Sequence, residues 1–350
     1  SVSPNLFCLK KFYRTAIITL FTNLNYIIMK KNLFLIGLAA IGMLFASCSN
    51  DETVEVAKNQ NGIQFKSFVN NSTRATDLTT ANLTDFQVWG IMKKDNQIGK
   101  PFVGTQVNKA GGAWSYGTPV YWEKGYQYSF VAVAPAGAFE METAPADYQD
   151  YGKVKFNNGR GDTDLLWATN NKGLVTWDGD VCPAAVDLTF NHMLSRVRFN
   201  FVNAMDDGSL LTVKDVQITN ACTEGTVQLI ADNAGLAWAA SGNAALLFDN
   251  AAETGFAQNA VCTTGHKYMI PTTKAYNVTF KVERAHNGVV DTYEHSVNLT
   301  EMQMESGKSY QFKAEFTSQN INPEGALCPI VFTADVNGWD AWGDAIDMNM

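Results

Sequence analysis

Apolar and polar residues alternate with a period of two along much of this chain, and no other feature constrains its fold as strongly. Such alternation puts successive side chains on opposite faces of a strand, so that one face is buried and the other faces water. The dipeptide Asn287-Gly288 lies between two such segments and is typical of a hairpin turn. No helical pattern persists for three turns, so the sequence predicts an all-β protein of antiparallel β-sandwiches. The clearest predicted strands are residues 126–132, 186–190, 197–201, 276–283 and 310–316.

A break in the alternation indicates where one domain ends and the next begins. The pattern stops at residues 192–195 and then resumes. We expect an N-terminal β-sandwich at 75–195 and a C-terminal β-sandwich at 196–350. The roughly 300 residues that follow the leader are enough for two domains of ordinary size.

Residues 29–47 have the three-part organisation of a lipoprotein signal peptide. Basic residues at 30–31 are followed by an apolar run at 33–45, and two small residues precede Cys48. The run is shorter than the roughly 20 residues that span a bilayer. We expect Cys48 to carry the lipid as the first residue of the mature protein, anchored at a membrane from outside the cytoplasm. An ordinary signal peptide with an incidental Cys48 is the alternative.

Residues 1–28 precede this signal and contain no acidic residue, but they hold a second apolar patch at 15–21. We interpret them as the product of a start-site error, with translation beginning at Met29, and a two-part membrane anchor is the alternative. Residues 1–47 are therefore expected to be absent from the mature protein.

The balance of charge argues against several kinds of partner. All 34 acidic residues but only 21 of the 26 Lys and Arg residues follow residue 48, which gives that part a net charge of −13. Binding to nucleic acid, or to anionic lipid by charge, is not expected of such a protein. The later cysteines form no C-x-x-C pair, so no zinc site is expected. Both disulfides and small buried thiols are compatible with Cys182, Cys222, Cys262 and Cys328.

The residue types that carry catalysis or bind metals form no recognisable motif. The histidines are scattered, no G-x-S-x-G surrounds a serine, and Met302 stands where a phosphate-binding loop ending in Gly307-Lys308-Ser309 requires glycine. Acidic residues near the C-terminus have the wrong offsets for a calcium loop. We therefore expect no enzyme, no cofactor and no metal site. The residues concerned are His192, His266, His286, His295, Asp335, Asp340, Asp344 and Asp347.

The leader at 48–74 contains a short predicted strand and part of a polar loop. The strand, at 63–69, is apolar at Ile63, Phe65 and Val69, and a lone arginine, Arg74, follows it. Proteases cut in mobile polar loops, so a trypsin-like enzyme can reach the bond after this arginine. From composition alone, an ordinary surface loop is the favoured interpretation.

Six short pieces of sequence, each weak alone, follow one another in a characteristic order. They are Cys48 with its small neighbours, T-R-A at 73–75, PVYWEKGYQYSFVAVAPAG from Pro119, DLLWAT from Asp164, LTFNHMLSRVRFNF from Leu188 and IVFTADVNGWDAW from Ile330. Together they resemble the fimbrillin-like (Mfa-like) family of Bacteroides-type bacteria, whose members are subunits of surface fimbriae. The strongest element is DLLWAT followed by F-x-H-x-L-S-R-V, and the resemblance extends over nearly all of the mature chain.

The resemblance implies two transthyretin-like β-sandwich domains and export as a lipoprotein. It also implies cleavage between Arg74 and Ala75 by an arginine-specific protease, with removal of the strand at 63–69. A neighbouring subunit then donates an extended segment to the vacated groove. The implied location is the cell outer membrane and the fimbrium, on the extracellular face. The implied partners are other fimbrial subunits, the outer membrane through the precursor's lipid, and host or bacterial surface ligands.

The segment 330–350 is the candidate donor strand. Its first residues alternate as in a strand that enters a groove with one face, and large aromatic residues dominate interface energies where they find pockets. The alternative is that 330–336 is simply the last strand of the second sandwich. The apolar positions of the segment are Ile330, Phe332, Val336, Trp339 and Trp342.

Stalk, anchor and tip subunits share these features, so the sequence predicts a structural or accessory subunit, with a tip position as the variant. The competing class is a surface glycan-binding lipoprotein, because the eight tryptophans offer faces that stack on sugar rings. We expect a fimbrillin to lose the segment before Ala75 and to form polymer ladders. A glycan binder is expected to keep Cys48 and to bind one polysaccharide.

Overall fold

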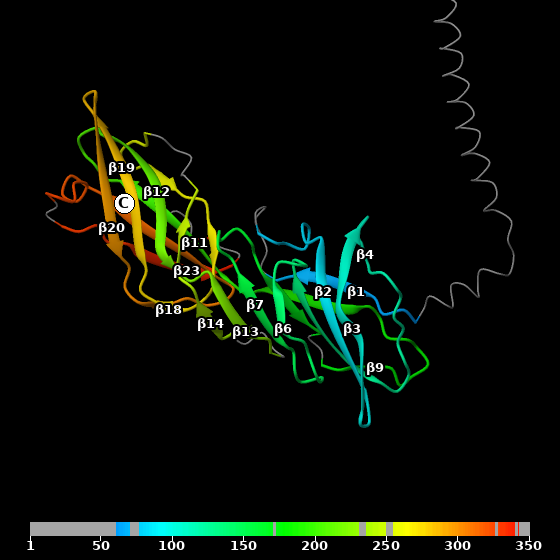
Figure 1. Cartoon of the computed structure of the whole chain (residues 1–350). Helices are drawn as coiled ribbons and strands as arrows, with labels where there is room; N and C mark the ends of the chain where they lie inside the picture. Colours follow the sequence, from blue (N-terminus) through cyan, green and yellow to red (C-terminus); the bar gives the residue numbers. More distant parts are fainter. Residues whose placement is uncertain are drawn as a thin grey trace, which may run out of the picture. The chain divides into compact units, whose positions relative to one another are not determined.

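The computed structural model describes residues 61–70, 77–170, 173–230, 236–249, 255–325, 328–339 and 342. Over these residues the protein is all-β, as the alternation predicts, and its strands form five sheets (Figure 1). No helix that could cross a membrane occurs among them. Apart from Asn61, the described residues belong to one compact unit, Gly62–Met350.

The first sheet contains eight strands in the order β1-β10-β8-β5-β2-β3-β4, and β9 also pairs with β5. Its pairs are antiparallel except for β1 with β10, which is parallel. The strands are β1 (Phe65–Val69), β2 (Asp85–Lys94), β3 (Gln97–Ala110), β4 (Ala113–Ser115), β5 (Gln127–Ala134), β8 (Leu166–Thr169), β9 (Val175–Thr176) and β10 (Val186–His192).

A second sheet, in the order β14-β13-β7-β6, combines strands from both sides of residue 195. The pairing of β7 with β13 makes this connection. Because this sheet includes residues from both predicted domains, it does not mark a boundary between them, and the boundary near residue 195 stays a prediction. The strands are β6 (Glu140–Thr143), β7 (Lys153–Asn157), β13 (Glu224–Gln228) and β14 (Trp238–Ser241).

Two further sheets face each other in the C-terminal part of the unit, which we call the C-terminal sandwich. One has the order β16-β11-β22-β23 with β17 also on β11, and the other has the order β15-β12-β19-β20. Strands β11 and β22 run parallel, whereas the other pairs are antiparallel. The strands are β11 (Ser195–Asn203), β12 (Leu210–Ala221), β15 (Ala244–Leu247), β16 (Val261–Thr263), β17 (Lys267–Met269), β19 (Asn277–His286), β20 (Val289–Asn298), β22 (Lys308–Phe316) and β23 (Thr333–Gly338), and the fifth sheet pairs β18 (Thr273–Lys274) with β21 (Met302–Gln303).

Strand β5 shows how the apolar side chains are divided between cores. Its Phe130 and Ala132 belong to a core that also holds the side chains of β1, which we call the first core. Val131 and Val133, on its opposite face, belong to a middle core shared with β7 and β13. The prediction that each strand has one wet face is therefore wrong for β5, because the second sheet covers the face that the sequence leaves open.

The five predicted strands are confirmed as β5, β10, β11, β19 and β22. The hairpin prediction is also confirmed, since Asn287 and Gly288 connect β19 to β20 with φ angles of 50° and 79°. A left-handed backbone of this kind favours asparagine and glycine. A third core fills the C-terminal sandwich, between the sheets of β11 and β19.

Candidate functional site

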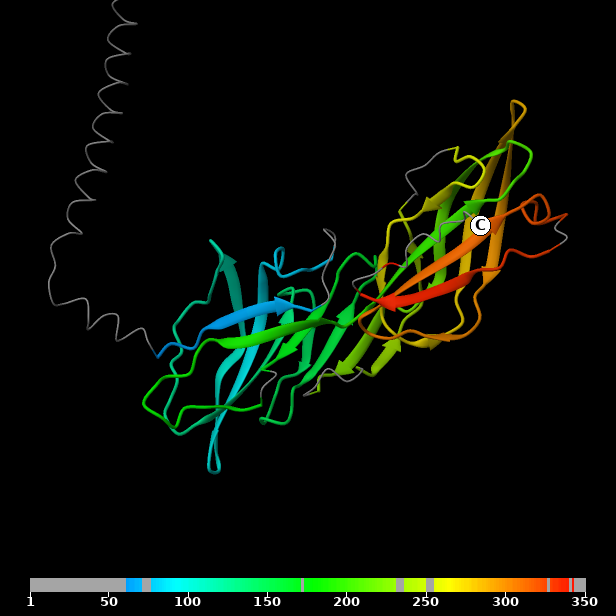
Figure 2. The ribbon, with the colours of Figure 1, turned by 180° about the vertical axis from the view of Figure 1, so that it is seen from behind.

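Strand β1, the predicted removable strand, lies at the end of the first sheet, and the residues just before it also contact backbone on the other side. It pairs in parallel with β10 along all of its residues, as the blue and green strands of Figure 2 show. On its other side, the N–H of Ile63 donates a hydrogen bond to the carbonyl of Val120 at 2.8 Å, and Gly62 forms a bridge with Tyr121. The segment is therefore held along both edges at its beginning.

Alternate side chains of β1 point into the first core. Phe65 is 5% exposed, whereas Phe68 is 51% exposed. Ile63 and Val69 are buried on the same side as Phe65. The Phe65 ring lies at centroid distances of 5.4 to 6.0 Å from four other rings, those of Phe86, Phe102, Tyr116 and Phe130. The strand thus fills the first core as an apolar plug.

The predicted cleavage loop follows β1 directly in the sequence. The Asn70 N–H donates a hydrogen bond to the Phe190 carbonyl at 2.8 Å, and the next described residue is Asp77. Arg74 and Ala75, between these two points, lie outside the described residues, as does Cys48. Cleavage and lipidation therefore stay predictions.

The candidate donor segment contains β23, which pairs antiparallel with β22 at the edge of its sheet (Figure 2). In this state the segment is the last strand of its own sandwich, and donation requires β23 to leave that edge. Ile330 is buried, and Phe332 is partly buried and packs against the third core. Val336 is 51% exposed, whereas Trp339 and Trp342, which follow the strand, are only 1% and 4% exposed.

A groove of about 760 Å³ lies between β23 and β20, at the open side of the C-terminal sandwich. Phe312 on β22, Leu299 after β20, and Phe332 and Ala334 of the last segment line it. Among the described strands, β20 and β23 each pair on one side only. Strand β23 is consequently a solvated edge, exposed or half-buried along its length.

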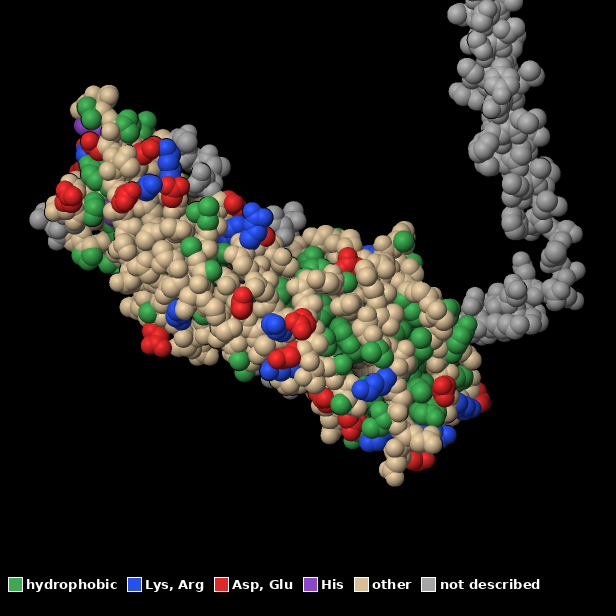
Figure 3. All heavy atoms as spheres, viewed as in Figure 1, with side chains coloured by type: hydrophobic (Ala, Val, Ile, Leu, Met, Phe, Trp, Pro, Cys, Tyr) green, Lys and Arg blue, Asp and Glu red, His purple; other side chains and the backbone are tan. Residues whose placement is uncertain are grey.

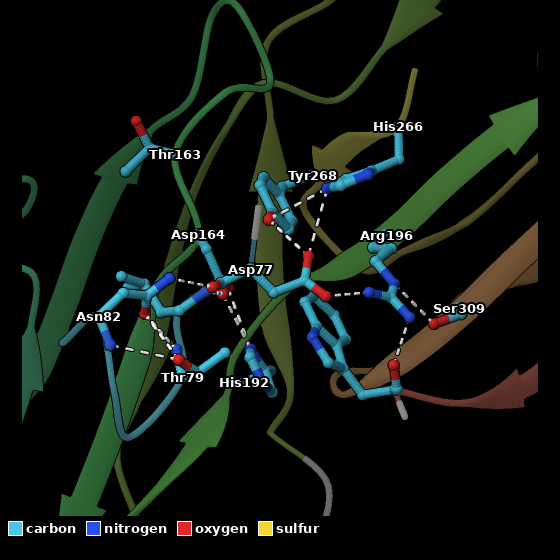
Figure 4. Close-up of polar contacts among 12 residues, drawn as sticks. Asp77, Thr79, Asn82, Thr163, Asp164, His192, Arg196, His266, Tyr268 and Ser309 are labelled. Atoms are coloured by element: carbon cyan, nitrogen blue, oxygen red, sulfur yellow. Dashed lines mark hydrogen bonds and ion pairs between the residues drawn. The ribbon is translucent and has the colours of Figure 1, made fainter. Parts of the chain in front are cut away.

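A buried polar cluster joins the first described residues after the predicted cleavage loop to several later parts of the chain (Figure 4). Asp77 is its centre, and one of its carboxylate oxygens forms an ion pair with Arg196. The other oxygen accepts a hydrogen bond from the Tyr268 hydroxyl at 2.8 Å and lies 3.2 Å from Nε2 of His266. We call this group the junction cluster; its members are Asp77, Leu78, Asp164, His192, Arg196, His266, Tyr268, Ser309, Trp339 and Trp342.

Arg196, on β11, reaches the end of the last strand. Its Nε donates to Oγ of Ser309 at 2.9 Å, and its Nη2 donates to the main-chain carbonyl of Trp339. The guanidinium carbon lies 4.3 Å from the ring centroid of Trp342, a distance at which a cation is attracted to an aromatic face. One side chain therefore contacts both tryptophans that follow β23.

The indole of Trp339 lies nearly parallel to two other rings. Its indole stacks on His192 with a centroid distance of 3.9 Å and an interplanar angle of 14°, and on Tyr268 at 5.8 Å and 8°. Nδ1 of His192 is 3.0 Å from a carboxylate oxygen of Asp164. The same oxygen accepts a hydrogen bond from the Leu78 N–H at 3.2 Å.

The electrostatics of the cluster favour an ionised Asp77. Burial alone raises the pKa of Asp77, but the hydrogen bond with His266, the charge of Arg196 and the hydroxyl of Tyr268 outweigh it and hold the pKa below 3.8. The pKa of Tyr268 is raised, first by burial and then by the charges of Asp164 and Asp77. The phenol therefore stays protonated and serves as a donor.

The contacts described above hold distant chain segments together. Among the described residues no group of three or more His, Cys, Asp and Glu side chains could hold a metal ion. Cys182, Cys222 and Cys328 are free thiols. None of the eight tryptophans is among the exposed side chains.

Apolar side chains also gather on the outer surface of the first sheet, around β2, β3 and β9 (Figure 3). On β3, Ile98 and Val103 are 46% and 65% exposed. Exposed apolar patches of this kind are typical of surfaces that contact another molecule.

The sequence predicted some of the important residues of this site and missed others. It selected Trp339 and Trp342 as candidate donor residues, and the structure brings both into the junction cluster. It did not select Asp77 or Arg196. The one available signal was that Arg196 lies within the motif LSRV, beside apolar strand positions where an arginine needs a buried partner.

The chain is similar to several solved structures. A candidate cell adhesion protein from Bacteroides ovatus has a TM-score of 0.50 and 15% identity, over 81% of this chain and 99% of the other. A second, from Bacteroides uniformis, has a TM-score of 0.44 and 14% identity, over 81% and 98% of the two chains. The tip fimbrial protein Mfa3 from Porphyromonas gingivalis, with a C-terminal truncation, has a TM-score of 0.40 and 10% identity, over 73% and 94%.

No curated protein matches the sequence. At this level of identity, the similarity to the Bacteroides ovatus protein shows a common fold and nothing further. The family model described as fimbrillin-like matches residues 73–339, which is more than half of the chain. The protein therefore belongs to the fimbrillin-like family.

Proposed function

We propose that this protein is a subunit of a cell-surface fimbria, exported as a lipoprotein and joined to its neighbours by strand donation after trimming between Arg74 and Ala75. Membership of the fimbrillin-like family supports the subunit role. The observation that supports the mechanism is the position of β1. This strand pairs with β10 and fills the first core, and the segment that contains Arg74 follows it directly in the sequence. We assign it a structural or accessory position, with the tip as the variant.

The energetics of β1 support such an exchange. Full burial of an apolar side chain contributes about 1.5–3 kcal/mol, so Ile63, Phe65 and Val69 together contribute roughly 5–9 kcal/mol as an upper estimate. Loss of the strand uncovers this apolar surface together with the unpaired edge of β10. An incoming strand restores both the ladder and the apolar contacts, which is the basis of binding by β-augmentation.

The last segment has the chemistry that the vacated slot requires. Its even-numbered residues, from Ile330 to Val336, are small or apolar, like the core-facing residues of β1. In the free subunit β23 is a half-exposed edge strand, so its departure uncovers less apolar surface than the departure of a central strand would. We therefore assign the donor role to residues 330–350, with other fimbrial subunits as the partners.

The experiment is cleavage of the purified precursor with an arginine-specific protease, followed by N-terminal sequencing and gel electrophoresis without boiling. We expect a chain that begins at Ala75 and a ladder of polymers. Arg74→Ala should give neither product. Arg74→Lys is the matched control, because it resists the arginine-specific protease but is cut by trypsin, and trypsin should then restore the ladder. Trimmed chains that begin at Ala75 and remain monomeric would show that strand donation is wrong.

The glycan-binding alternative receives less support from the described residues. Stacking on sugars requires an exposed aromatic face, and none of the eight tryptophans is exposed in this fold. The apolar surface around Ile98 and Val103 is instead suited to contact with another protein.

A further inference from the structure

The side chains of strand β23 contribute little burial to its retention. The side chains of Thr333–Gly338 are exposed or half-buried, because the groove beside β20 leaves the strand open to solvent. Its ladder with β22 is one-sided. Well-buried residues lie on either side of the strand: Ile330 before it is 7% exposed, and Trp339 and Trp342 after it are 1% and 4% exposed. The junction cluster therefore anchors the C-terminal end of the last strand.

Three side chains hold Trp339 in that cluster. The rings of His192 and Tyr268 both stack with its indole. Arg196 donates to its carbonyl, and the guanidinium carbon lies 5.1 Å from its ring centroid.

Each of these three side chains is in turn held by the dipeptide Asp77-Leu78. The Asp77 carboxylate pairs with Arg196 and accepts the Tyr268 hydroxyl at 2.8 Å (Figure 4). The Leu78 N–H donates to Asp164, which contacts Nδ1 of His192 at 3.0 Å. The dipeptide lies 119 residues from Arg196 in sequence but only three residues after Arg74.

We propose that Asp77-Leu78 is a latch that couples the processing site to the last strand, so that trimming after Arg74 loosens the hold of the junction cluster on Trp339. The link between Asp77 and Trp339 stands on the contacts above, whereas its use during assembly rests on the proposed function. In the untrimmed chain Asp77 is tethered to β1 on one side and to Asn82 on the other, where the Asn82 side chain donates to the Asp77 carbonyl at 2.7 Å.

Trimming weakens the latch because it makes Asp77 the third residue of the chain, and residues at a free terminus are less ordered than residues tied at both ends. A buried arginine that loses a carboxylate partner is destabilised until water reaches it. Displacement of Trp339 and Trp342 admits that water, and β23 leaves with them.

The test is hydrogen exchange, measured by mass spectrometry, of the β23 amides in the untrimmed precursor and in the trimmed monomer isolated by gel filtration. We expect trimming to speed exchange in β23 at least tenfold without changing exchange in β12 or β19. Asp77→Asn in the untrimmed precursor should produce the same change, and trimming of that variant should add little. Asp207→Asn is the matched control, because Asp207 pairs with Arg284 outside the junction cluster. It should leave exchange in β23 as in the parent.

Several outcomes would overturn the proposal. Unchanged exchange in β23 after trimming of the parent protein refutes it, and this measurement needs no variant that has to fold. An Asp77→Asn precursor whose β23 exchanges as in the parent refutes it as well. If the trimmed protein polymerises but the β23 amides of its monomer exchange as in the precursor, strand donation is supported and the latch is refuted. If trimming speeds exchange in β23 but no polymer forms, the latch is supported and strand donation is refuted.

Discussion

Phe65 meets Phe102 edge to face, with the two ring centroids 5.4 Å apart, inside the first core. Phe65 belongs to β1, the strand that we propose is removed, and Phe102 belongs to β3, which remains. The segment that we propose is discarded during maturation is therefore part of the core of the precursor. A substitution at Phe65 should therefore change the stability of the precursor without changing that of the assembled subunit.

Phe65→Ala should destabilise the untrimmed precursor by about 3–5 kcal/mol, because it removes a buried ring and leaves a cavity. Urea denaturation monitored by tryptophan fluorescence measures the change. Phe68→Ala, at a side chain that is 51% exposed on the same strand, is the control and should shift the free energy of unfolding by no more than about 0.5 kcal/mol.

Polymer assembled from trimmed Phe65→Ala subunits should be as stable as polymer of the parent protein, because the substituted residue is no longer present. A polymer weakened by Phe65→Ala would mean that β1 is retained in the fimbria, in conflict with the proposed function.

The strands of this fold could be predicted because the period of two is a property of each strand by itself. Residues 126–132 and 310–316 display it without reference to any neighbour. The second buried face of β5 could not be predicted in this way. The sheet that covers it is assembled from β6, β7, β13 and β14, and no local pattern states that such distant segments will pair.

The candidate site, too, could be predicted from the sequence only in part. The apolar positions of β1 and of the last segment follow from alternation and composition. The contacts of Arg196 with Asp77 and with Trp339 do not, since 119 and 143 residues separate the partners. An ion pair of this kind is specified by the fold, and a single sequence shows only that a polar residue interrupts an apolar segment.

Cys48→Ala should leave the precursor without lipid and release it from the membrane fraction. Each buried methylene of an acyl chain contributes about 0.8 kcal/mol to membrane binding, so several chains hold a protein without a spanning helix. Fractionation of cells and the intact mass of the precursor provide the measurement. Cys8→Ala, in the segment that we expect to be absent, is the control and should behave as the parent. A Cys48→Ala protein that still sediments with membranes would place the anchor elsewhere, with residues 15–21 as the first segment to test.

The stability of the C-terminal sandwich should fall as the pH drops below about 6.5. Burial lowers the pKa of His295 below its ordinary value, against a smaller opposing effect of its hydrogen bond with the backbone of Ile321. Its ring stacks on Phe280 at a centroid distance of 5.1 Å, and its Nε2 has no hydrogen-bond partner among the described residues. The folded protein thus resists a proton that the unfolded chain accepts. The stabilisation is complete above the unfolded pKa and is lost as the pH falls below it.

The slope between pH 6.5 and 5 should approach, at most, about 1.4 kcal/mol per pH unit for this one proton. His295→Gln should reduce that slope in urea denaturation experiments at half-unit intervals of pH. His286→Gln, at the end of the β19–β20 hairpin, is the control and should retain the slope of the parent. A slope that persists in His295→Gln would assign the pH dependence to another group.

Val336→Lys distinguishes a donor strand from a strand that serves only its own sandwich. In the free subunit Val336 is 51% exposed, so a lysine in its place should change the free energy of unfolding by no more than about 0.5 kcal/mol. In a polymer built by strand donation, the same residue has to enter an apolar slot, where an unpaired ammonium group is strongly disfavoured. We therefore expect a stable, trimmed monomer that gives no ladder. Val331→Lys, at a residue that is 67% exposed and of the opposite parity along the segment, is the matched control and should polymerise as the parent does. If Val336→Lys forms the same ladder as Val331→Lys, this face of the segment does not enter the groove of a neighbour, and the donor assignment is wrong.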